Sequence, residues 1–585
     1  MGSFFKIFFA TLVSLIVFSL IIFFFIVVLV GNMLSRETVK ANPKSVLVLD
    51  LSQHFSEQEI KNPLSAISND PELDKPGLYD VVRMIRRAKT DNNISGIYIM
   101  ADGNANGFAS SEEIRDAVVD FKESKKFVIS FGNVMSQRAY HVADVADKIY
   151  LNPSGYLEWV GFSVDLAFIK GTLDKLEIQP QIFYAGKYKS ATEIFRTDKM
   201  TPENKLQTTV WLNNLYNYFL IKASEQRKID TAALHQLANE AKIQTAQDAL
   251  ENKLVDGLKY DDQVKDEIKS KLGVGKNGKI NFISVNKYAK AVNFKRSGSS
   301  RIALIYAEGD IVDGSNNKIG IIASDNYVKL IRKARQDDDV KAIVFRVNSG
   351  GGSALASENI WRELFLAKQA KPVVVSFGDV AASGGYYISC AADSIFAAPT
   401  TITGSIGVFG IIPNMESFFK NKLGITFDGV KTAPYADAGT LHPLNETEKK
   451  MAQHGVDIIY EQFKKRVADG RKKDTSYVDS IGQGRVWSGN DGLKIGLVDR
   501  FGGLQQAVDC AARMAKVSDY RLREYPEAHS ILDRIFNSSS KDDAATSKIK
   551  TGLGAENYKI YQQMLRIREM TQGVQTRLPF EFFIH

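Results

Sequence analysis

The sequence predicts an α/β fold in which one unit occurs twice in tandem, behind an N-terminal transmembrane helix. Three observations predict it. Short apolar runs rich in β-branched residues alternate with helical patterns, which indicates largely parallel strands. A long internal stretch of the chain matches a later one, and the N-terminal part holds an uninterrupted apolar run. The length of 585 residues allows roughly two to four domains.

The apolar run comes first in the chain. No charged residue occurs between Ile7 and Ser35, whereas about 20 apolar residues suffice to span a bilayer. No small-residue cleavage motif follows the run, as it would in a signal peptide. We therefore expect an uncleaved anchor over residues 1–40, with its helix over about 7–31; a cleaved signal peptide is the alternative. Positive charges flank the run on both sides, so charge alone does not fix its orientation.

The body of the chain repeats itself. Residues 128–161 match residues 374–407 without a gap, and further matches lie on both sides of this segment. Self-similarity over such a distance indicates that one structural unit occurs twice. We predict a first repeat over 41–296, a second repeat over 297–520, and a C-terminal tail over 521–585 that is flexible at first and ends in a helix.

Each repeat alternates strand and helix patterns. In the second repeat, Asn445 and Glu448 form a capping-box-like start for a long helix. We predict strands there over 301–309, 341–349, 371–379 and 393–400, and helices over 325–337, 357–369, 386–393 and 448–470.

One serine stands out in the second repeat. Ser383 lies between two alanines and two glycines, after an apolar run that predicts a buried strand. A serine on a strand-to-helix bend exposes its hydroxyl near helix-start N–H groups, which suits a nucleophile. The first repeat has Gln137 at the matching position, and likewise Trp159 where the second has Ser405. The alternative is that both serines are structural.

A glycine-rich loop, NSGGGS, occupies residues 348–353, where the first repeat has DGNANG at 102–107. Backbone N–H groups can approach a substrate closely where no side chain intervenes. The amides of Gly351 and of Gly384, the residue after Ser383, are therefore candidates for an oxyanion hole. The alternative is a tight turn that binds nothing.

A nucleophilic serine needs a base. No histidine lies in a sequence pattern typical of a catalytic base. The segment YAGKYKSATEIF, residues 184–195, carries lysines that its second-repeat counterpart lacks. Burial can lower a lysine pKa by several units and leave the amine neutral. Lys189 and Lys187 are both candidates on spacing alone, since residues two apart share one side of an extended chain. Each would be an ordinary surface lysine otherwise. One repeat keeps the lysine and the other the serine, which suggests a composite site.

Composition excludes several other functions. Two cysteines, Cys390 and Cys510, are too few for a disulfide framework, although one pair is possible. No histidine spacing matches a metal site, so we expect no metal and no cofactor. The net charge of +8 is not gathered into a basic patch with aromatic residues, so no nucleic-acid partner is expected.

Four motifs carry a resemblance to a known family: ASGGYY, TITGSIGV, the GGGSALASE loop and the distant YKSA. Taken together, they make the chain resemble the long, duplicated form of the signal peptide peptidase A (protease IV) family over roughly residues 45–520. The resemblance implies a crotonase-like α/β unit shared with Clp-type proteases. It implies that Ser383 is the nucleophile and Lys189 the general base of a Ser/Lys dyad, with Ser405 orienting the lysine. The amides of Gly351 and Gly384 would then form the oxyanion hole.

The resemblance also implies a function. It is that of a serine endopeptidase that degrades cleaved signal peptides and similar apolar peptides. The implied protein is a homotetramer anchored in the bacterial inner membrane, with its body on the periplasmic side. The family loop has proline where this chain has Gly350, which leaves the free loop more mobile. Two alternatives stay open, an inactive membrane scaffold of the same fold and a crotonase-type acyl-CoA enzyme.

Overall fold

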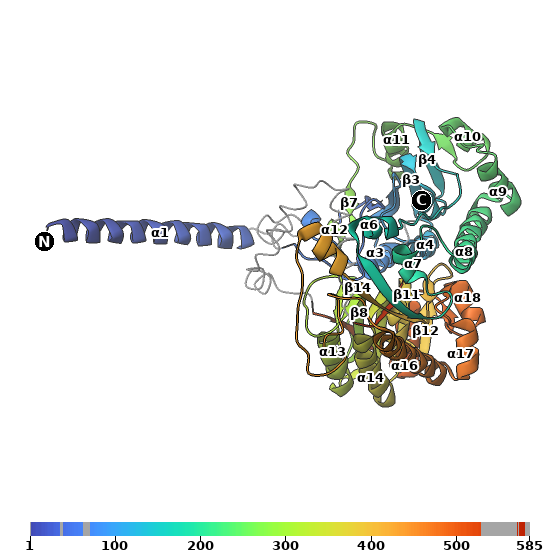
Figure 1. Ribbon diagram of the computed structural model, residues 1–585. Helices are drawn as coiled ribbons and strands as arrows, with labels where there is room; N and C mark the ends of the chain where they lie inside the picture. Colours follow the sequence, from blue (N-terminus) through green and yellow to red (C-terminus); the bar gives the residue numbers. More distant parts are fainter. Residues whose placement is uncertain (1, 35–38, 63–70, 528–569, 571–572, 579–585) are drawn as a thin grey trace.

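The computed structural model describes residues 2–34, 39–62, 71–527, 570 and 573–578. Helix α1 (Gly2–Leu34) extends beyond the predicted span at both ends and stands apart from the body in Figure 1. Within it, Phe4–Phe24 is long and apolar enough to cross a membrane, judged by length and composition, and none of that window is buried. The helix expected in the C-terminal tail lies outside the described residues.

In the part of the chain that the structure describes, the first sheet is formed by six parallel strands in the order β6-β4-β3-β2-β1-β7. Both of its faces are covered: Leu47 and Ile97 belong to one apolar cluster, and their neighbours Val46 and Tyr98 to another. Such double burial is usual for parallel sheets. The strands are β1 (Ser45–Asp50), β2 (Ile94–Met100), β3 (Phe127–Met135), β4 (Lys148–Leu157), β6 (Gly257–Leu258) and β7 (Phe282–Ser284), and the helices of this half are α3 (Leu78–Thr90), α4 (Phe108–Lys122), α5 (Gln137–Ala143), α6 (Lys170–Leu176), α7 (Glu193–Arg196), α8 (Pro202–Arg227), α9 (Thr231–Asn239), α10 (Ala246–Glu251), α11 (Asp261–Leu272) and α12 (Val285–Ala291).

Over the described residues, the second sheet has twelve strands and lies in the other half of the body, with α13, α14, α16 and α17 in the lower part of Figure 1. Asn445 and Glu448 make the predicted capping box at the start of α16. The strands are β5 (Gln179–Ala185), β8 (Ser300–Val312), β9 (Ile321–Ala323), β10 (Val340–Ser353), β11 (Val373–Ala382), β12 (Ser394–Ala397), β13 (Ile402–Gly404), β14 (Val408–Asn414), β15 (Val486–Ser488), β16 (Arg500–Phe501), β17 (Tyr520–Tyr525) and β18 (Gln575–Arg577), and the helices are α13 (Ser324–Gln336), α14 (Ala354–Ala370), α15 (Gly384–Tyr387), α16 (Glu446–Arg471), α17 (Thr475–Ile481), α18 (Gly489–Lys494) and α19 (Leu504–Met514).

The two halves repeat one topology, which confirms the duplication. The order β1-β2-β3-β4-β6 of the first sheet corresponds to β8-β10-β11-β12-β16 of the second. Matching side chains make matching bonds: Asp256 accepts from the Ile149 amide at 2.8 Å, and its counterpart Asp499 from the Ile395 amide at 2.7 Å. The structure therefore repeats in its polar contacts as well as in its strands.

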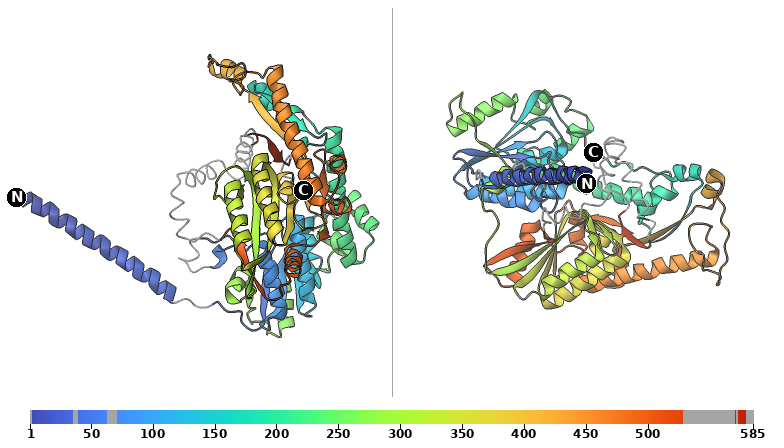
Figure 2. Two further views of the ribbon diagram at one scale, coloured as in Figure 1. Left: turned by 90° about the horizontal axis from the view of Figure 1, so that it is seen from below. Right: turned by 90° about the vertical axis from the view of Figure 1, so that its left-hand side faces the viewer.

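Strand β5 crosses from one repeat to the other. Its residues belong to the first repeat in sequence, yet it pairs antiparallel with β14 of the second sheet, with Ala185 opposite Val408. It also contacts α16, and in the right-hand view of Figure 2 this helix and β14 reach out from the body beside the chain that follows β4. The crossing carries the segment after β5, which includes Lys189, into the second half.

Two sequence expectations were wrong in detail. The second sheet continues beyond residue 520, because β17 pairs parallel with β8 through Tyr525. The helix expected over 386–393 is the single turn α15, which ends at Tyr387. It ends early because Ser389 Oγ and Cys390 Sγ bond back to the carbonyls of Gly385 and Tyr387, a local contact that competes with helix propagation.

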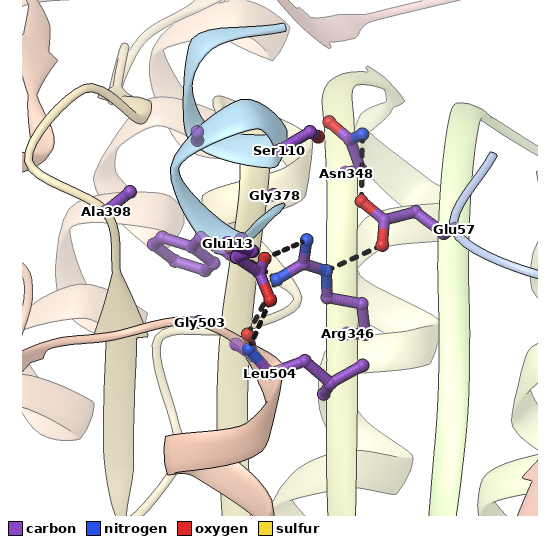
Figure 3. Close-up of polar contacts among 12 residues, drawn as sticks. Glu57, Ser110, Glu113, Arg346, Asn348, Gly378, Ala398, Gly503 and Leu504 are labelled. Atoms are coloured by element: carbon purple, nitrogen blue, oxygen red, sulfur yellow. Dashed lines mark hydrogen bonds and ion pairs between the residues drawn. The ribbon is translucent and has the colours of Figure 1, made fainter. Parts of the chain in front are cut away.

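A buried ionic cluster joins the two repeats (Figure 3). Arg346 of β10 is fully buried, and its guanidinium lies 2.8 Å from Glu57 and 2.7 Å from Glu113, both from the first repeat. Glu57 also accepts from Asn348, and Glu113 accepts from the Leu504 amide. Burial raises the pKa of Glu57 to about 7, and the charge of Arg346 opposes that rise. Breaking such a pair leaves an uncompensated buried charge, so the cluster fixes how the halves meet.

A second contact across the same boundary caps a helix. The N-cap position of α4, Gly107, has no side chain to accept from the first amides of the helix. Asp379 of β11 accepts instead from the amides of Ala109 and Ser110, and from Ser110 Oγ at 2.5 Å. A carboxylate at a helix N-terminus is favourable both as a cap and by the helix dipole.

Candidate active site

Ser383 lies at the bend between β11 and α15, as the sequence predicts. Its backbone has φ 53° and ψ −115°, a conformation that non-glycine residues rarely adopt. The Ser383 amide donates to the Gly404 carbonyl at 2.8 Å, which ties the bend to the neighbouring strand β13. Strain of this kind persists only where the surroundings impose it, and it is frequent at functional sites.

Ser405 follows β13 and lies beside Ser383, because β13 pairs parallel with β11 and places Gly404 opposite Ala382. It too has a positive φ, 49°, and its amide donates to the Arg485 carbonyl at 2.7 Å. Both serine side chains are fully buried. Two neighbouring strand ends thus present two hydroxyls to one point, as the ends of parallel strands often do.

Lys189 reaches the same point from the first repeat. After β5 the chain turns, with the Tyr188 amide donating to the Gln483 carbonyl at 2.8 Å. Gly484 has φ +76°, and a Cβ on it would come within 2.6 Å of the Lys189 backbone. Only glycine at 484 therefore lets the lysine segment pack this closely.

The three side chains meet at hydrogen-bonding distance. Lys189 Nζ lies 2.9 Å from Ser383 Oγ, 3.1 Å from Ser405 Oγ and 3.3 Å from the Ser405 carbonyl oxygen. The lysine is 1% exposed. A nucleophile, a base within reach of it and a third group that orients the base form the arrangement needed for nucleophilic catalysis.

Burial sets the protonation of Lys189. It lowers the pKa of the amine well below the usual value of 10.5, because the charged form loses its hydration. A lysine with a depressed pKa can be neutral near pH 7, when its lone pair can accept the proton of Ser383. The lowered pKa of Lys189 and its short distance to Ser383 Oγ therefore both favour this lysine as a general base.

The structure separates the two candidate lysines. Lys187 is exposed, and its Nζ lies 5.1 Å from the centre of the Tyr188 ring, whereas Lys189 is buried. Spacing could not distinguish Lys187 from Lys189 because both were expected in an extended segment. The turn after β5 removes that ambiguity.

The glycine loop forms the end of β10 beside the nucleophile. A Cβ on Gly351, which has φ +101°, would lie 2.6 Å from the Gly384 amide nitrogen, so the two predicted donors are neighbours. The Gly351 amide itself donates to Ser349 Oγ at 3.1 Å. Gly352, the next residue, lies opposite Thr576 of β18 in the strand register. The sequence analysis did not single out the Gly352 amide as a donor. Ser349 and Gly352 carry no sequence signal beyond their place in the loop.

The described cysteines and histidines lie elsewhere. Cys390 and Cys510 are separate, buried free thiols. Burial raises the pKa of the Cys390 thiol to about 12, so this thiol is not poised to react. His141 belongs to the first repeat, where its Nε2 lies 2.6 Å from Glu112. In the part of the chain that the structure describes, no bond joins a cysteine or a histidine to Lys189.

Comparison with known proteins shows the family to which the chain belongs. The model of peptidase family S49 matches residues 120–275 and 366–518, one region in each repeat. Protease 4 of Salmonella typhi is 36% identical over 540 residues, which cover 88% of this chain and 87% of that protein. Protease 4 of Haemophilus influenzae is 32% identical over 90% of each chain, and the chloroplastic serine protease SPPA of Arabidopsis thaliana is 30% identical over 81% of this chain and 69% of that protein.

The fold and these matches define a serine protease built as a tandem α/β duplication. The chain belongs to peptidase family S49.

Proposed function

We propose that this chain is a membrane-anchored serine endopeptidase that uses a Ser383/Lys189 dyad to degrade cleaved signal peptides and similar apolar peptides. The observation that carries the proposal is the 2.9 Å contact between the buried Lys189 Nζ and Ser383 Oγ. Family membership supports a protease, and the distance and burial support these two residues as its reacting groups.

The reaction begins with proton transfer. Neutral Lys189 takes the proton of Ser383 Oγ, and the oxygen attacks the peptide carbonyl carbon to give a tetrahedral intermediate. The negative oxygen is held by backbone amides, for which Gly351 and Gly384 are the proposed donors. Since the Gly351 amide donates to Ser349 Oγ in this structure, the amide of Gly352 is a further candidate.

The intermediate then collapses. Lys189 gives its proton to the leaving amine, the C–N bond breaks, and an ester between Ser383 and the acyl part of the peptide is left. Water attacks this ester with Lys189 as base, the C–O bond breaks, and the serine recovers its proton. Ser405 keeps the amine directed at Ser383 throughout, since its hydroxyl lies 3.1 Å from Lys189 Nζ.

The proposed location is supported in part by the N-terminal helix and by the family. We assign α1 as the membrane anchor, with the body on the periplasmic side of a bacterial inner membrane and four copies in the assembly. The apolar window Phe4–Phe24 and the bacterial Protease 4 relatives support the anchor. A membrane tether would keep the enzyme close to signal peptides, whose apolar cores stay in the bilayer after release.

The test uses the full-length chain in detergent. A synthetic peptide with a leucine-rich signal-peptide core and a polar peptide of equal length are incubated with wild type and with Ser383→Ala, and products are identified by mass spectrometry. We expect cleavage of the apolar peptide by wild type alone. Equal cleavage by the serine variant would overturn the dyad, and a folded wild type that cuts neither peptide would favour the inactive scaffold.

A further inference from the structure

The chain places one of its own C-terminal strands beside the candidate active site. Strand β18, Gln575–Arg577, runs antiparallel to the glycine-rich end of β10 and also pairs antiparallel with β14. Backbone bonds extend the pairing at both ends, from the Leu578 amide to the Gly350 carbonyl at 2.7 Å and from the Ala354 amide to the Val574 carbonyl at 3.1 Å. The strand therefore fills a gap between two edges that would otherwise be free to bind an extended peptide.

The register of β18 brings one peptide carbonyl beside the two glycines proposed as oxyanion donors. Thr576 pairs with Gly352, and its carbonyl oxygen lies where a Cβ on Gly351 would be, 1.9 Å from the ideal position. The same oxygen lies 2.9 Å from the ideal Cβ position of Gly384, the residue that follows Ser383. A substrate must present the carbonyl to be attacked at this place, between the glycine loop and the start of α15.

The side chains of the strand are also accommodated. The Thr576 side chain is fully buried, and its hydroxyl donates to the Gly352 carbonyl at 3.2 Å and lies 3.5 Å from Ser357 Oγ. Arg577 is 8% exposed, with Nη1 3.6 Å from the carboxylate of Asp310. The groove thus holds a small hydroxylated side chain at the carbonyl position and a cationic one after it.

With β18 in place the site is closed. Ser383 and Ser405 are fully buried, and Lys189 is 1% exposed. An endopeptidase must admit the backbone of a second peptide to its nucleophile. A substrate that pairs with β10 and β14 would need the positions that β18 holds.

We propose that residues 573–578 are an internal pseudosubstrate: they occupy the peptide groove in the orientation of a substrate, and a peptide binds only when they leave. The groove consequently prefers extended peptides with a small residue at the position of Thr576 and a basic residue at that of Arg577. The substrate class rests on the proposed function, whereas the competition between β18 and a peptide rests on the strand pairing.

Binding in a variant that cannot cleave tests the inference. Full-length Ser383→Ala is compared with Ser383→Ala/Thr576→Trp, in which the indole does not fit the buried threonine site. The probe is a fluorescein-labelled peptide of sequence GVQTRL, followed by fluorescence anisotropy. We expect the double variant to bind it at least about tenfold more tightly, because apparent affinity falls with the fraction of molecules whose groove is open.

Two further variants make the experiment decisive. Ser383→Ala/Arg577→Glu places like charges at the Asp310 contact, and we expect it to bind more tightly than Ser383→Ala by a smaller factor, without a bulky residue in the core. Ser383→Ala/Thr90→Trp, at an exposed threonine in the first repeat, should match Ser383→Ala. Circular dichroism melts establish that each variant is folded.

Equal affinity in the folded Thr576 and Arg577 variants and in Ser383→Ala would overturn the inference, as would failure of all of them to bind the probe. Neither result depends on cleavage, because the nucleophile is absent from every protein compared. Loss of the proposed function would show instead as a wild type that cuts no peptide, whatever the affinities.

Discussion

At the strand-to-helix bend, the two repeats differ in backbone conformation. In the first repeat Ser136 caps α5 with φ −72° and ψ 157°, and its side chain accepts from the Ala139 amide. In the second repeat Ser383 stands before α15 with φ 53° and makes no capping bond. The same fold thus tolerates an ordinary cap or a strained residue whose hydroxyl is left for Lys189. The fold itself therefore does not require the strained conformation of Ser383.

At the position of Ser405, the two repeats differ in side-chain packing. Its counterpart Trp159 is fully buried, donates from its indole nitrogen to the Leu234 carbonyl at 2.9 Å, and packs against Tyr140 and Phe219. Where the second repeat has two hydroxyls that meet the amine of Lys189, the first repeat has an aromatic cluster. The first repeat thus has an apolar core at the place where the second has polar side chains.

What the repeats share is scaffold. Tyr140 donates to the Leu254 carbonyl at 2.8 Å, and its counterpart Tyr386 to the Leu497 carbonyl at 3.0 Å. These contacts hold the bend against the rest of each repeat. Predictions can therefore compare matched positions, one in each half.

The largest expected effect distinguishes Ser383 from its counterpart. Ser383→Ala should lower kcat/KM for a peptide by about 10⁴-fold or more, because it removes the oxygen proposed to form the acyl-enzyme. Gln137→Ala, at the matching position, removes a side chain that bonds the Gly161 carbonyl and the Val160 and Gly161 amides, so we expect a lower melting temperature and unchanged kcat/KM. Steady-state kinetics of both variants measure these effects. A comparable loss of kcat/KM in the Gln137 variant would show that the two repeats do not differ in their catalytic role.

The next effect concerns the base. Lys189→Met keeps the volume of the side chain but removes the lone pair, and we expect a loss of about 10³-fold or more in kcat/KM. Lys187→Met, two residues away and exposed, serves as the matched control and should retain activity within about twofold. Similar losses in the two variants would mean that the turn after β5 does not select the base.

A stability effect should appear in the first repeat. Trp159→Ala leaves a cavity in the aromatic cluster and should cost about 3–5 kcal/mol in the free energy of unfolding. Activity per folded molecule should stay close to wild type, because Trp159 does not contact the Lys189 site. Denaturant unfolding with parallel kinetics checks both parts, and a variant of full stability would argue against the packing role of the indole.

The smallest expected effect is a pH dependence of stability. The pKa of Lys189 is lowered in the folded chain, so the unfolded chain binds more protons between that lowered pKa and 10.5. The free energy of unfolding therefore rises with pH in this window. Lys189→Met lacks this penalty and should melt a few degrees above wild type at pH 6, with the difference shrinking toward pH 10. Parallel melting curves across pH that never converge would contradict the cause assigned to the pKa.

Much of the fold could be predicted from the sequence. Alternation and self-similarity predict two α/β units, because Val128–Gly161 and its repeat carry the same apolar pattern. The site residues could be proposed because losses are complementary, a serine in one half and a lysine in the other. Sequence alone could not place β5 in the second sheet, since strand pairing between distant segments leaves no local pattern.

Other features had no sequence signal. The separation of Lys189 from Lys187 depends on a turn that Gly484, almost three hundred residues later, permits. The occupation of the groove by β18 depends on Gln575–Arg577, a short polar segment in a part of the chain expected to be a tail. Long-range pairing of this kind is set by the shape of the finished sheet.

The central claim is that the two repeats together form one Ser/Lys dyad. Labelling of the full-length chain with a peptide-like, serine-reactive probe tests it most directly, with the modified residue located by mass spectrometry. We predict labelling at Ser383 that rises with pH as Lys189 loses its proton, disappears in Lys189→Ala and persists in Lys187→Ala. Labelling that survives in Lys189→Ala, or a folded wild type that takes up no label at any pH, would contradict the account.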